Sequence, residues 1–283
     1  MEPFVRKYEE NTPALYFLKK WMEDEPHLQV GFTGRQGGCS HAPYSSLNLA
    51  YHVDDNAVDV LQNRITLARA IGFEPSTWTC GEQVHGTQIA VVEASDVGKG
   101  YSDRESAFQN TDGLVTNVPN ILLTSFYADC VPLYFFDKVK GVIGLAHAGW
   151  KGTVGQISKV MITTMTETYG CAPHHIYAAI GPSIGDCCYE VDEYVMSRVR
   201  ETLADIGGDI DINVIASPSS NEGKSMLNLK ELNRMIMIKA GILPEFIECT
   251  TWCTSCHPDQ FFSYRKEEGT TGRMASWIGM KER

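Results

Sequence analysis

Residues 121–153 read ILLTSFYADCVPLYFFDKVKGVIGLAHAGWKGT, and this stretch decides the class of fold. Two apolar runs, 131–136 and 141–146, flank the polar segment 137–140, and this pattern predicts a β-hairpin. His147 follows the second run, and the glycine-containing turn after it leads into apolar residues at helical spacing between Thr153 and Tyr169. A hairpin that runs directly into a helix indicates a mixed α/β protein.

The rest of the chain continues this alternation of strands and helices. Further strands are predicted at 27–35, 78–92, 113–117, 121–128, 175–180, 212–216, 247–252, 261–265 and 273–280. Further helices are predicted over 192–206 and from Asn228 to Gly241. Because the sequence shows no repeat and no long linker, we expect one domain over residues 1–283, with helices layered outside the sheets.

Composition narrows the class of protein. The chain has 283 residues, 43% of them hydrophobic, and a formal net charge of −11. So acidic a chain is not expected to bind nucleic acid or an anionic membrane through its overall charge, and small-molecule substrates are the expected partners. No apolar stretch approaches the about 18 residues that suggest a membrane span. The N-terminal residues show no secretory pattern, so we expect a cytoplasmic protein, with its nine cysteines as thiols or metal ligands.

Polar residues at the ends of the predicted strands suggest a site. Cys130 precedes the hairpin and His147 ends it, so the hairpin returns these two residues to the same edge; His85 comes from elsewhere in the chain. Two imidazoles and a thiolate suit zinc with one open coordination position, which is the catalytic pattern. Alternatively, Cys130 is a nucleophile and His147 its base, with Asp129 or a main-chain carbonyl orienting the imidazole. Asp129 is also a candidate for proton transfer.

Ordered motifs along the chain resemble the YfiH-like family, and the bacterial members most closely. These motifs are Thr33-Gly-Arg35-Gln-Gly37-Gly38-Cys-Ser40, Ser46-Leu-Asn48-Leu, Asp54-Asp55 followed by Asn63-Arg64, Gln83-Val-His85-Gly86, Thr111-Asp112-Gly113-Leu114, Ala128-Asp129-Cys130, His147-Ala-Gly149-Trp150, Ile180-Gly181-Pro182-Ser183-Ile184 and Phe262-Ser-Tyr264-Arg265 through Gly272-Arg273. Members have been described as laccase-domain or polyphenol oxidase proteins and as purine nucleoside phosphorylases. The resemblance implies an α/β/β/α sandwich with His85, Cys130 and His147 as zinc ligands. It also implies phosphorolysis of adenosine, inosine, guanosine and methylthioadenosine, with adenosine deamination as a second activity.

Two other enzyme classes compete with the phosphorylase. A multicopper oxidase needs a histidine-rich cluster built from His-x-His pairs, whereas this sequence has eight histidines and no such pair. Copper can occupy a site of two imidazoles and a thiolate, but zinc is the expected metal and a copper-dependent polyphenol oxidase the less favoured function. The runner-up is a Cys130–His147 hydrolase or amidase that acts on a peptidoglycan precursor. A non-catalytic binding protein is a third hypothesis.

Phosphorolysis also requires groups that bind phosphate and nucleoside. Arg35 and Arg64 are the best candidates for phosphate, because both stand in the motifs and a guanidinium binds phosphate through two hydrogen bonds. Asn48 and Gln83 are candidates for the ribose hydroxyls or the base, and Arg265 is a further cationic candidate. A surface ion pair is the alternative interpretation of Arg64 and Arg265.

Cys253-Thr-Ser-Cys256-His257 spells the attachment motif of c-type haem. Haem is not expected here, because no export signal accompanies the motif. A zinc ribbon would need a second pair of cysteines, and the adjacent Cys187 and Cys188 are not expected to supply it. A redox role for Cys253 and Cys256 stays open.

Overall fold

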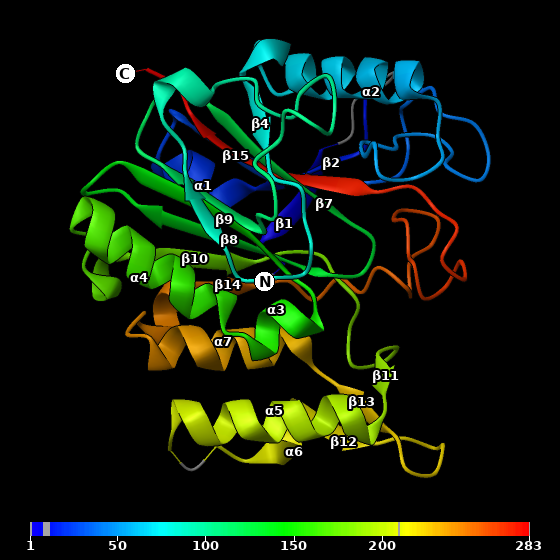
Figure 1. Ribbon diagram of the computed structural model, residues 1–283, viewed down its shortest axis with the longest axis vertical. Coiled ribbons are helices and arrows are strands. Elements are labelled where there is room, and N and C mark those ends of the chain that lie inside the picture. The colour runs from blue at the N-terminus through cyan, green and yellow to red at the C-terminus, as the bar shows by residue number, and fades with distance from the viewer. Residues whose placement is uncertain (1, 8–11, 209, 283) are drawn as a thin grey trace.

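Two six-stranded sheets packed face to face form the centre of the protein (Figure 1). The computed structural model describes residues 2–7, 12–208 and 210–282. From top to bottom in Figure 1, the layers are α2 (Ala57–Ala70), the first sheet, the second sheet, and a group of helices that includes α4 (Ile157–Tyr169) and α7 (Leu229–Lys239). This order confirms the predicted α/β/β/α sandwich.

The first sheet has the strand order β1-β2-β3-β15-β7-β4. Its strands are β1 (Phe4–Lys7), β2 (Leu15–Leu18), β3 (Leu28–Thr33), β15 (Met274–Met280), β7 (Leu122–Tyr127) and β4 (Trp78–Cys80). The last strand of the chain therefore lies in the middle, antiparallel to both β3 and β7, whereas β4 is parallel to β7. Gly31 of β3 allows the close approach of β15, because a Cβ there would lie 2.5 Å from the Trp277 ring.

The second sheet has the strand order β14-β10-β8-β9-β6-β5. Its strands are β14 (Ile247–Cys249), β10 (Tyr177–Ile180), β8 (Val131–Asp137), β9 (Val142–Ala148), β6 (Gly113–Thr116) and β5 (Ile89–Val91). Strands β8 and β9 are the predicted hairpin, with Val131 opposite Ala148 and Pro132 opposite His147. Both strands are buried over their whole length, which explains why each reads as a continuous apolar run.

The remaining elements cover the sheets or connect them. The other α-helices are α1 (Lys19–Asp24), α3 (Trp150–Val154), α5 (Glu193–Ile206) and α6 (Ile212–Ile215). Short 3-10 helices are η1 (Pro75–Thr77), η2 (Ala94–Asp96), η3 (Pro173–His175) and η4 (Pro244–Phe246). A small antiparallel sheet joins β11 (Glu190–Val191), β13 (Ser225–Leu227) and β12 (Ala216–Pro218). Among the described residues, no helix is both long and apolar enough to span a bilayer.

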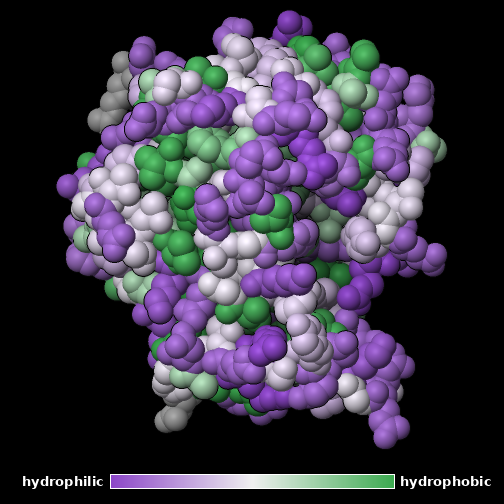
Figure 2. Space-filling view, in the orientation of Figure 1, coloured by the Kyte–Doolittle hydropathy of each residue, from purple (hydrophilic) through white to green (hydrophobic). Residues whose placement is uncertain are grey.

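Three buried apolar clusters hold the layers together. The cluster between the sheets includes Phe32 and Leu145. A second cluster joins the outer face of the second sheet to the helices, with Met161 of α4 among its members. A third joins Trp277 of the first sheet to Leu67 of α2. The outer surface is mostly hydrophilic on the face drawn in Figure 2, where hydrophobic side chains form small scattered groups. Burial of apolar area in three layers is therefore the main stabilising contribution.

Several sequence predictions are wrong in detail. Within the predicted strand 212–216, residues 212–215 form α6 and only Ala216 is in a strand, because the Asp211 side chain caps the helix by accepting the backbone N–H of Asn213. Segment 261–265 is a loop in which the Ser263 and Arg265 amides donate to the side chains of Glu267 and Asp129 instead of to a neighbouring strand. Segment 78–92 is divided into β4 and β5 by a loop that carries His85. Helix α2 and strands β1 and β2 were not predicted.

Candidate metal centre and substrate pocket

The side chains of His85, Cys130 and His147 converge as the sequence suggested. Their nitrogen and sulfur ligand atoms all lie within 4.8 Å of one another. Cys130 Sγ is 3.8 Å from His85 Nε2, and the two imidazole rings stand edge to face with centroids 4.9 Å apart. His147 is buried, Cys130 is half-buried and His85 is exposed. The group is therefore open to solvent on one side.

The hairpin places two of the three side chains. Cys130 directly precedes β8 and His147 is the second-last residue of β9, so the register of the strand pair brings them together. Gly149 then allows the third side chain to approach. A Cβ at position 149 would lie 2.7 Å from His85 Cδ2 and 3.1 Å from Cys130 Sγ, so no larger residue fits without displacing these side chains.

Asp112 connects the two histidines. Its Oδ1 lies 2.8 Å from His147 Nδ1 and also accepts the backbone N–H of His85 at 2.9 Å. Its Oδ2 accepts the N–H groups of Val84 and Gly86 at 3.1 and 2.7 Å. These bonds hold His85 in a left-handed conformation with φ 62°. With Nδ1 bound to a carboxylate, His147 presents Nε2 as its ligating nitrogen, the common arrangement at metal sites.

Electrostatics in the triad favour the ionised thiol. Partial burial raises the pKa of Cys130, but the imidazoles of His147 and His85 lower it by more, to about 6. Burial lowers the pKa of His147, but the Cys130 thiolate and Asp112 raise this pKa by more, so that it is about 9. Burial likewise raises the pKa of Asp112, and the hydrogen bonds from His147 and the loop amides hold it below its usual value. A thiolate and two imidazoles form a donor set that suits zinc.

The triad lies in the wall of a pocket of about 680 Å³. This volume is in the range of small-molecule sites. The pocket reverses the charge balance of the chain, because five cationic side chains line it against three carboxyls. The cations are Arg64, Arg104, Lys151, Arg265 and Arg273, and the carboxyls are Glu82, Asp103 and Asp129. Aromatic residues complete the lining, among them the half-buried Tyr189 and Tyr264, which is 55% exposed. The pocket therefore suits an anionic group beside a flat ring.

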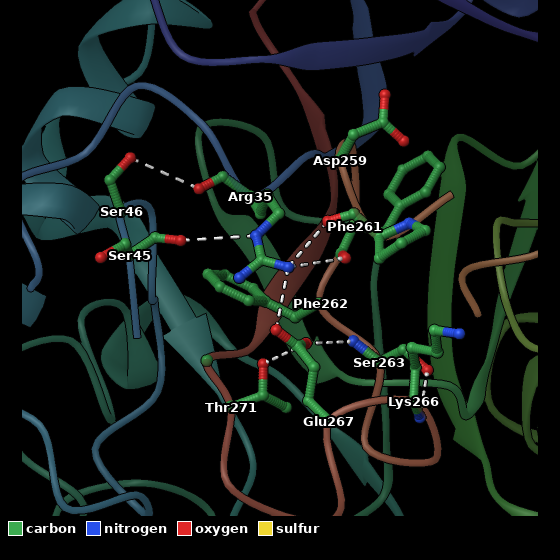
Figure 3. A network of polar contacts seen from close by, with 12 residues as sticks. Arg35, Ser45, Ser46, Asp259, Phe261, Phe262, Ser263, Lys266, Glu267 and Thr271 are labelled. Atoms are coloured by element: carbon green, nitrogen blue, oxygen red, sulfur yellow. Dashed lines mark hydrogen bonds and ion pairs between the residues drawn. The ribbon is translucent and has the colours of Figure 1, made fainter. Parts of the chain in front are cut away.

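Arg35 lies outside the residues that line the pocket. Its Nη1 is 3.0 Å from Glu267 Oε1 and donates to the carbonyl of Pro258, and its Nε donates to the Ser45 carbonyl (Figure 3). The guanidinium also stands 4.5 Å from the centre of the Phe262 ring. Arg35 thus fastens two loops together, and these contacts do not leave its guanidinium facing a pocket ligand.

Arg64 lines the pocket, but its guanidinium is engaged in the protein interior. The residue is 1% exposed. Its Nε donates to the Leu49 carbonyl at 2.8 Å, and its Nη1 donates to the carbonyls of Gly100 and Tyr101. Neither the predicted phosphate contact nor the surface ion pair matches this environment, which is that of a buried structural arginine.

Asn48 and Gln83 are also engaged with the protein. Asn48 is fully buried and lies outside the pocket. Its Nδ2 donates to Asp55, and its Oδ1 accepts the backbone N–H of Arg273. Gln83 lines the pocket, but its side chain is hydrogen-bonded to the backbone of Phe126 at both ends. Its Nε2 donates to the Phe126 carbonyl at 2.9 Å, and its Oε1 accepts the Phe126 N–H at 2.8 Å. Both side-chain amides, predicted to bind the ribose or the base, therefore form hydrogen bonds within the protein instead.

Asp129 and Arg265 lie together beside Cys130. Asp129 accepts hydrogen bonds from Thr254 Oγ1, Ser263 Oγ and Arg265 N at 2.6, 3.0 and 2.7 Å. The expectation that Asp129 orients an imidazole is corrected, because Asp112 has that position. Burial raises the pKa of Asp129, and its hydrogen bonds lower it by less. Arg265 lines the pocket with an exposed side chain and donates to the Glu190 carbonyl.

Sequence reasoning assigned no role to Asp112, Lys151, Arg104 or Arg273. Asp112 and Arg273 stand within quoted motifs, so the family resemblance could have marked them.

The prediction about the four cysteines is also wrong. Contrary to the expectation above, the adjacent Cys187 and Cys188 do meet Cys253 and Cys256, with all four sulfur atoms within 4.8 Å of one another.

Fold and site together define an α/β/β/α protein with a candidate His2Cys metal triad at the end of a buried hairpin. Residues 29–281 match the family model described as multi-copper polyphenol oxidoreductase laccase, and the chain belongs to this family. This assignment confirms the resemblance that the motifs indicated.

Similar proteins carry a different functional name. Purine nucleoside phosphorylase YlmD of Bacillus subtilis is 40% identical over 274 residues, which are 96% of each chain. The protein of the same name in Geobacillus stearothermophilus is 42% identical over 89% of this chain and 90% of its own. The crystal structure of YlmD from Geobacillus stearothermophilus matches with a TM-score of 0.91 and 38% identity, over 99% of this chain and 100% of that one.

Proposed function

We propose that this chain is a zinc-dependent purine nucleoside phosphorylase that acts on adenosine, inosine, guanosine and methylthioadenosine. The observation that carries the proposal is the open His85–Cys130–His147 triad in the wall of a cationic, aromatic pocket. Two relatives that are 40% and 42% identical bear the name purine nucleoside phosphorylase. The nine free cysteines are consistent with a reducing compartment, and we propose a cytoplasmic location.

Three side chains would hold the metal. His85 would bind through Nε2, Cys130 through its thiolate and His147 through Nε2, while Asp112 fixes the His147 ring and the His85 loop. Three protein ligands leave one position for a substrate atom or water. When bound, zinc supplies Lewis-acid chemistry at this position.

The pocket side chains supply the remaining functions. Arg265 and Lys151 have exposed cationic groups that would bind phosphate, with the half-buried Arg273 beside them. Tyr264 and Tyr189 provide aromatic faces on which a purine would stack. In phosphorolysis a phosphate oxygen forms a bond to C1′ and the bond from C1′ to the purine nitrogen breaks. The base leaves with the electron pair and takes up a proton, and ribose 1-phosphate remains.

We propose adenosine deamination as a second activity of the same site. Water adds at C6 of the base, and ammonia leaves with the transferred proton, so the product is inosine. Cys130 and the two imidazoles would lie beside the reacting carbon in a base bound with C6 toward the triad. The same pocket would then bind adenosine in two orientations.

A product assay tests the phosphorylase. Zinc-loaded protein is incubated with adenosine and phosphate, and adenine, inosine and ribose 1-phosphate are separated by chromatography. We expect adenine and ribose 1-phosphate, and loss of both on chelation or in His85→Ala. The control is His175→Ala, which removes an exposed imidazole of η3. Folded, zinc-loaded protein without nucleoside turnover would overturn the proposal.

A kinetic comparison tests the phosphate contact. Arg265→Gln should raise the KM for phosphate about tenfold, because one charge-assisted hydrogen bond contributes about 1.5 kcal/mol. The KM for adenosine should change much less. Arg200→Gln is the control, since it removes an exposed guanidinium from α5. Equal changes in the two KM values would contradict the assignment of Arg265.

A thiol hydrolase or amidase of peptidoglycan editing is the second candidate. The low pKa of Cys130, the raised pKa of His147 and the contact to Asp112 together resemble a Cys-His-Asp nucleophile. Such an enzyme would cleave an amide after chelation but not after alkylation of Cys130, whereas the zinc enzyme fails in both cases.

A copper-dependent polyphenol oxidase is the least favoured function. Within residues 2–7, 12–208 and 210–282, only the triad and the four-cysteine group bring three or more metal-binding side chains together, and the latter contains no histidine. A multicopper oxidase requires a further histidine-rich group for oxygen reduction.

A further inference from the structure

Four cysteines form a second convergent group, separate from the triad. Cys256 Sγ lies 3.4 Å from both Cys187 Sγ and Cys188 Sγ, and all four sulfur atoms, including that of Cys253, are within 4.8 Å of one another. Two chain segments supply them. These segments are joined by a parallel bridge between Ser183 and Cys253 and by a hydrogen bond from Thr254 N–H to the Ser183 carbonyl. The group is therefore built on paired backbone.

The sulfur spacing fits a tetrahedral ion. Zinc–sulfur bonds of about 2.3 Å place the four sulfur atoms of a tetrahedral site about 3.8 Å apart. The distances here, from 3.4 Å up to the limit of 4.8 Å, bracket that value. A disulfide requires sulfur atoms at about 2.05 Å, and none of the nine cysteines is paired in this way.

The surroundings of Cys253 favour an ionised sulfur. Gly185 N–H donates to Cys253 Sγ at 3.2 Å, and an N–H group directed at sulfur stabilises the thiolate. Gly185 leaves room for the cysteines to approach one another. A Cβ at this position would lie 3.2 Å from Cys187 Sγ and 3.3 Å from Cys253 Cβ. Cys253 is buried, whereas Cys187 and Cys256 are exposed, so an ion has a path from solvent.

We propose that Cys187, Cys188, Cys253 and Cys256 bind one zinc ion in a closed structural site. Four thiolates fill the coordination shell, so this site has no open position for substrate. Four sulfur ligands select zinc over the hard cations magnesium and calcium, which prefer oxygen. The inference does not depend on the nucleoside activity, because it concerns metal content alone.

The site would stabilise one wall of the substrate pocket. Ile184 and Tyr189, which flank the first pair of cysteines, line the pocket. Thr254, between the second pair, donates to Asp129, whose neighbour Cys130 belongs to the triad. The Cys188 carbonyl accepts from Arg265 Nη1 at 3.4 Å. Loss of the ion would therefore loosen Tyr189 and Arg265 while leaving the triad its three ligands.

Metal counting on the full chain tests the proposal. Protein purified under reducing conditions is analysed by elemental mass spectrometry, and we expect two zinc ions per chain. The Cys187→Ser, Cys253→Ser double variant should retain one, and so should His85→Ala. Cys39→Ser, which changes an exposed cysteine outside both groups, should retain two. Replacing zinc by cobalt should give sulfur-to-cobalt absorption from both sites. The double variant should keep only the weaker absorption of the single Cys130 thiolate, whereas His85→Ala should keep the stronger absorption of the four-thiolate site.

A second measurement covers the case in which the double variant does not fold. Wild-type protein is titrated with a mercurial thiol reagent in the presence of a zinc-sensitive dye, and two zinc ions should be released as the thiols react. A single zinc ion per wild-type chain that His85→Ala loses overturns the proposal, whereas a single ion that His85→Ala keeps lies in the four-cysteine site and counts against zinc in the triad instead. An intact mass that shows a disulfide among the four cysteines also overturns the proposal, and iron in place of zinc overturns the choice of metal.

Discussion

Asp112→Asn is the substitution that most directly tests how the triad is organised. In the structure Oδ1 serves His147 Nδ1 and the His85 amide, and Oδ2 serves the amides of Val84 and Gly86. An asparagine keeps only one of these oxygens. Whichever way the amide turns, two donors lose their acceptor and face an NH2 group, and the negative charge beside His147 is removed. The volume of the side chain hardly changes.

The expected magnitudes follow from these contacts. Two unsatisfied donors cost about 2–4 kcal/mol in the metal-free protein, since each costs about 1–3 kcal/mol and the loop is partly open to water. Zinc affinity should fall by about 10–100-fold, as it does when the carboxylate partner of a ligand histidine is removed. At about 1.4 kcal/mol for each tenfold change, this corresponds to about 1.4–2.8 kcal/mol of binding free energy.

Competition with a chelating dye measures the zinc dissociation constant, and His85→Ala serves to subtract zinc held outside the triad. Asp137→Asn is the matched control. Asp137 is as buried as Asp112 and accepts two backbone N–H groups, but it lies at the turn of the β8–β9 hairpin, at the opposite end from His147. It should leave zinc affinity unchanged. If Asp112→Asn bound zinc within twofold of the wild-type affinity, the argument that Asp112 organises the triad would be refuted.

Three further predictions concern the same region. Gly149→Ala should abolish zinc binding at the triad while circular dichroism shows an intact fold, because the new methyl group would press on His85 and Cys130; retained zinc would contradict this. In chelated protein, alkylation of Cys130 followed by mass spectrometry should rise through pH 6 instead of the ordinary pKa of 9, because the neighbouring imidazoles favour the thiolate; His147→Ala should move the midpoint upward, and an unchanged midpoint counts against the pairing. Arg64→Met should lower the free energy of unfolding in urea by roughly 3–5 kcal/mol, because two buried carbonyls and one half-buried carbonyl lose their donor. Unaltered stability with weakened phosphate binding would instead restore the phosphate role for Arg64.

The fold was predictable where hydrophobic pattern and burial coincide. Strands β8 and β9 are buried on both faces, so their apolar runs were unambiguous. Helix α2 was not predicted because its buried face includes Asn63 and Arg64 beside Val60 and Leu67. Two polar residues at core positions remove the apolar repeat on which helix prediction depends. Their hydrogen bonds to distant loops become visible only in three dimensions.

The site was predictable in its ligands and less so in their supporting groups. The hairpin alone suggested that Cys130 and His147 meet. By contrast, Asp112 is a single aspartate before a strand, and nothing in its local sequence shows that its four partners lie at 84–86 and 147. Arg35 was predicted to bind phosphate because a sequence does not show that Glu267 and a carbonyl already occupy its guanidinium.

The β8–β9 turn acts on the triad from the far end of the hairpin. Residues 138–141 form this turn, and Asp137 Oδ1 holds it by accepting the amides of Val139 and Lys140. Side chains alternate between the two faces of a strand, so shifting β9 by one residue against β8 would direct the His147 side chain away from Cys130. A one-residue deletion in this solvent-facing turn should therefore eliminate the metal site, although every ligand is still encoded. The length of the turn thus sets the strand register, and the register sets the positions of the ligands at the other end of the hairpin. Insertions or deletions at 138–141 should therefore be tolerated far less than substitutions there.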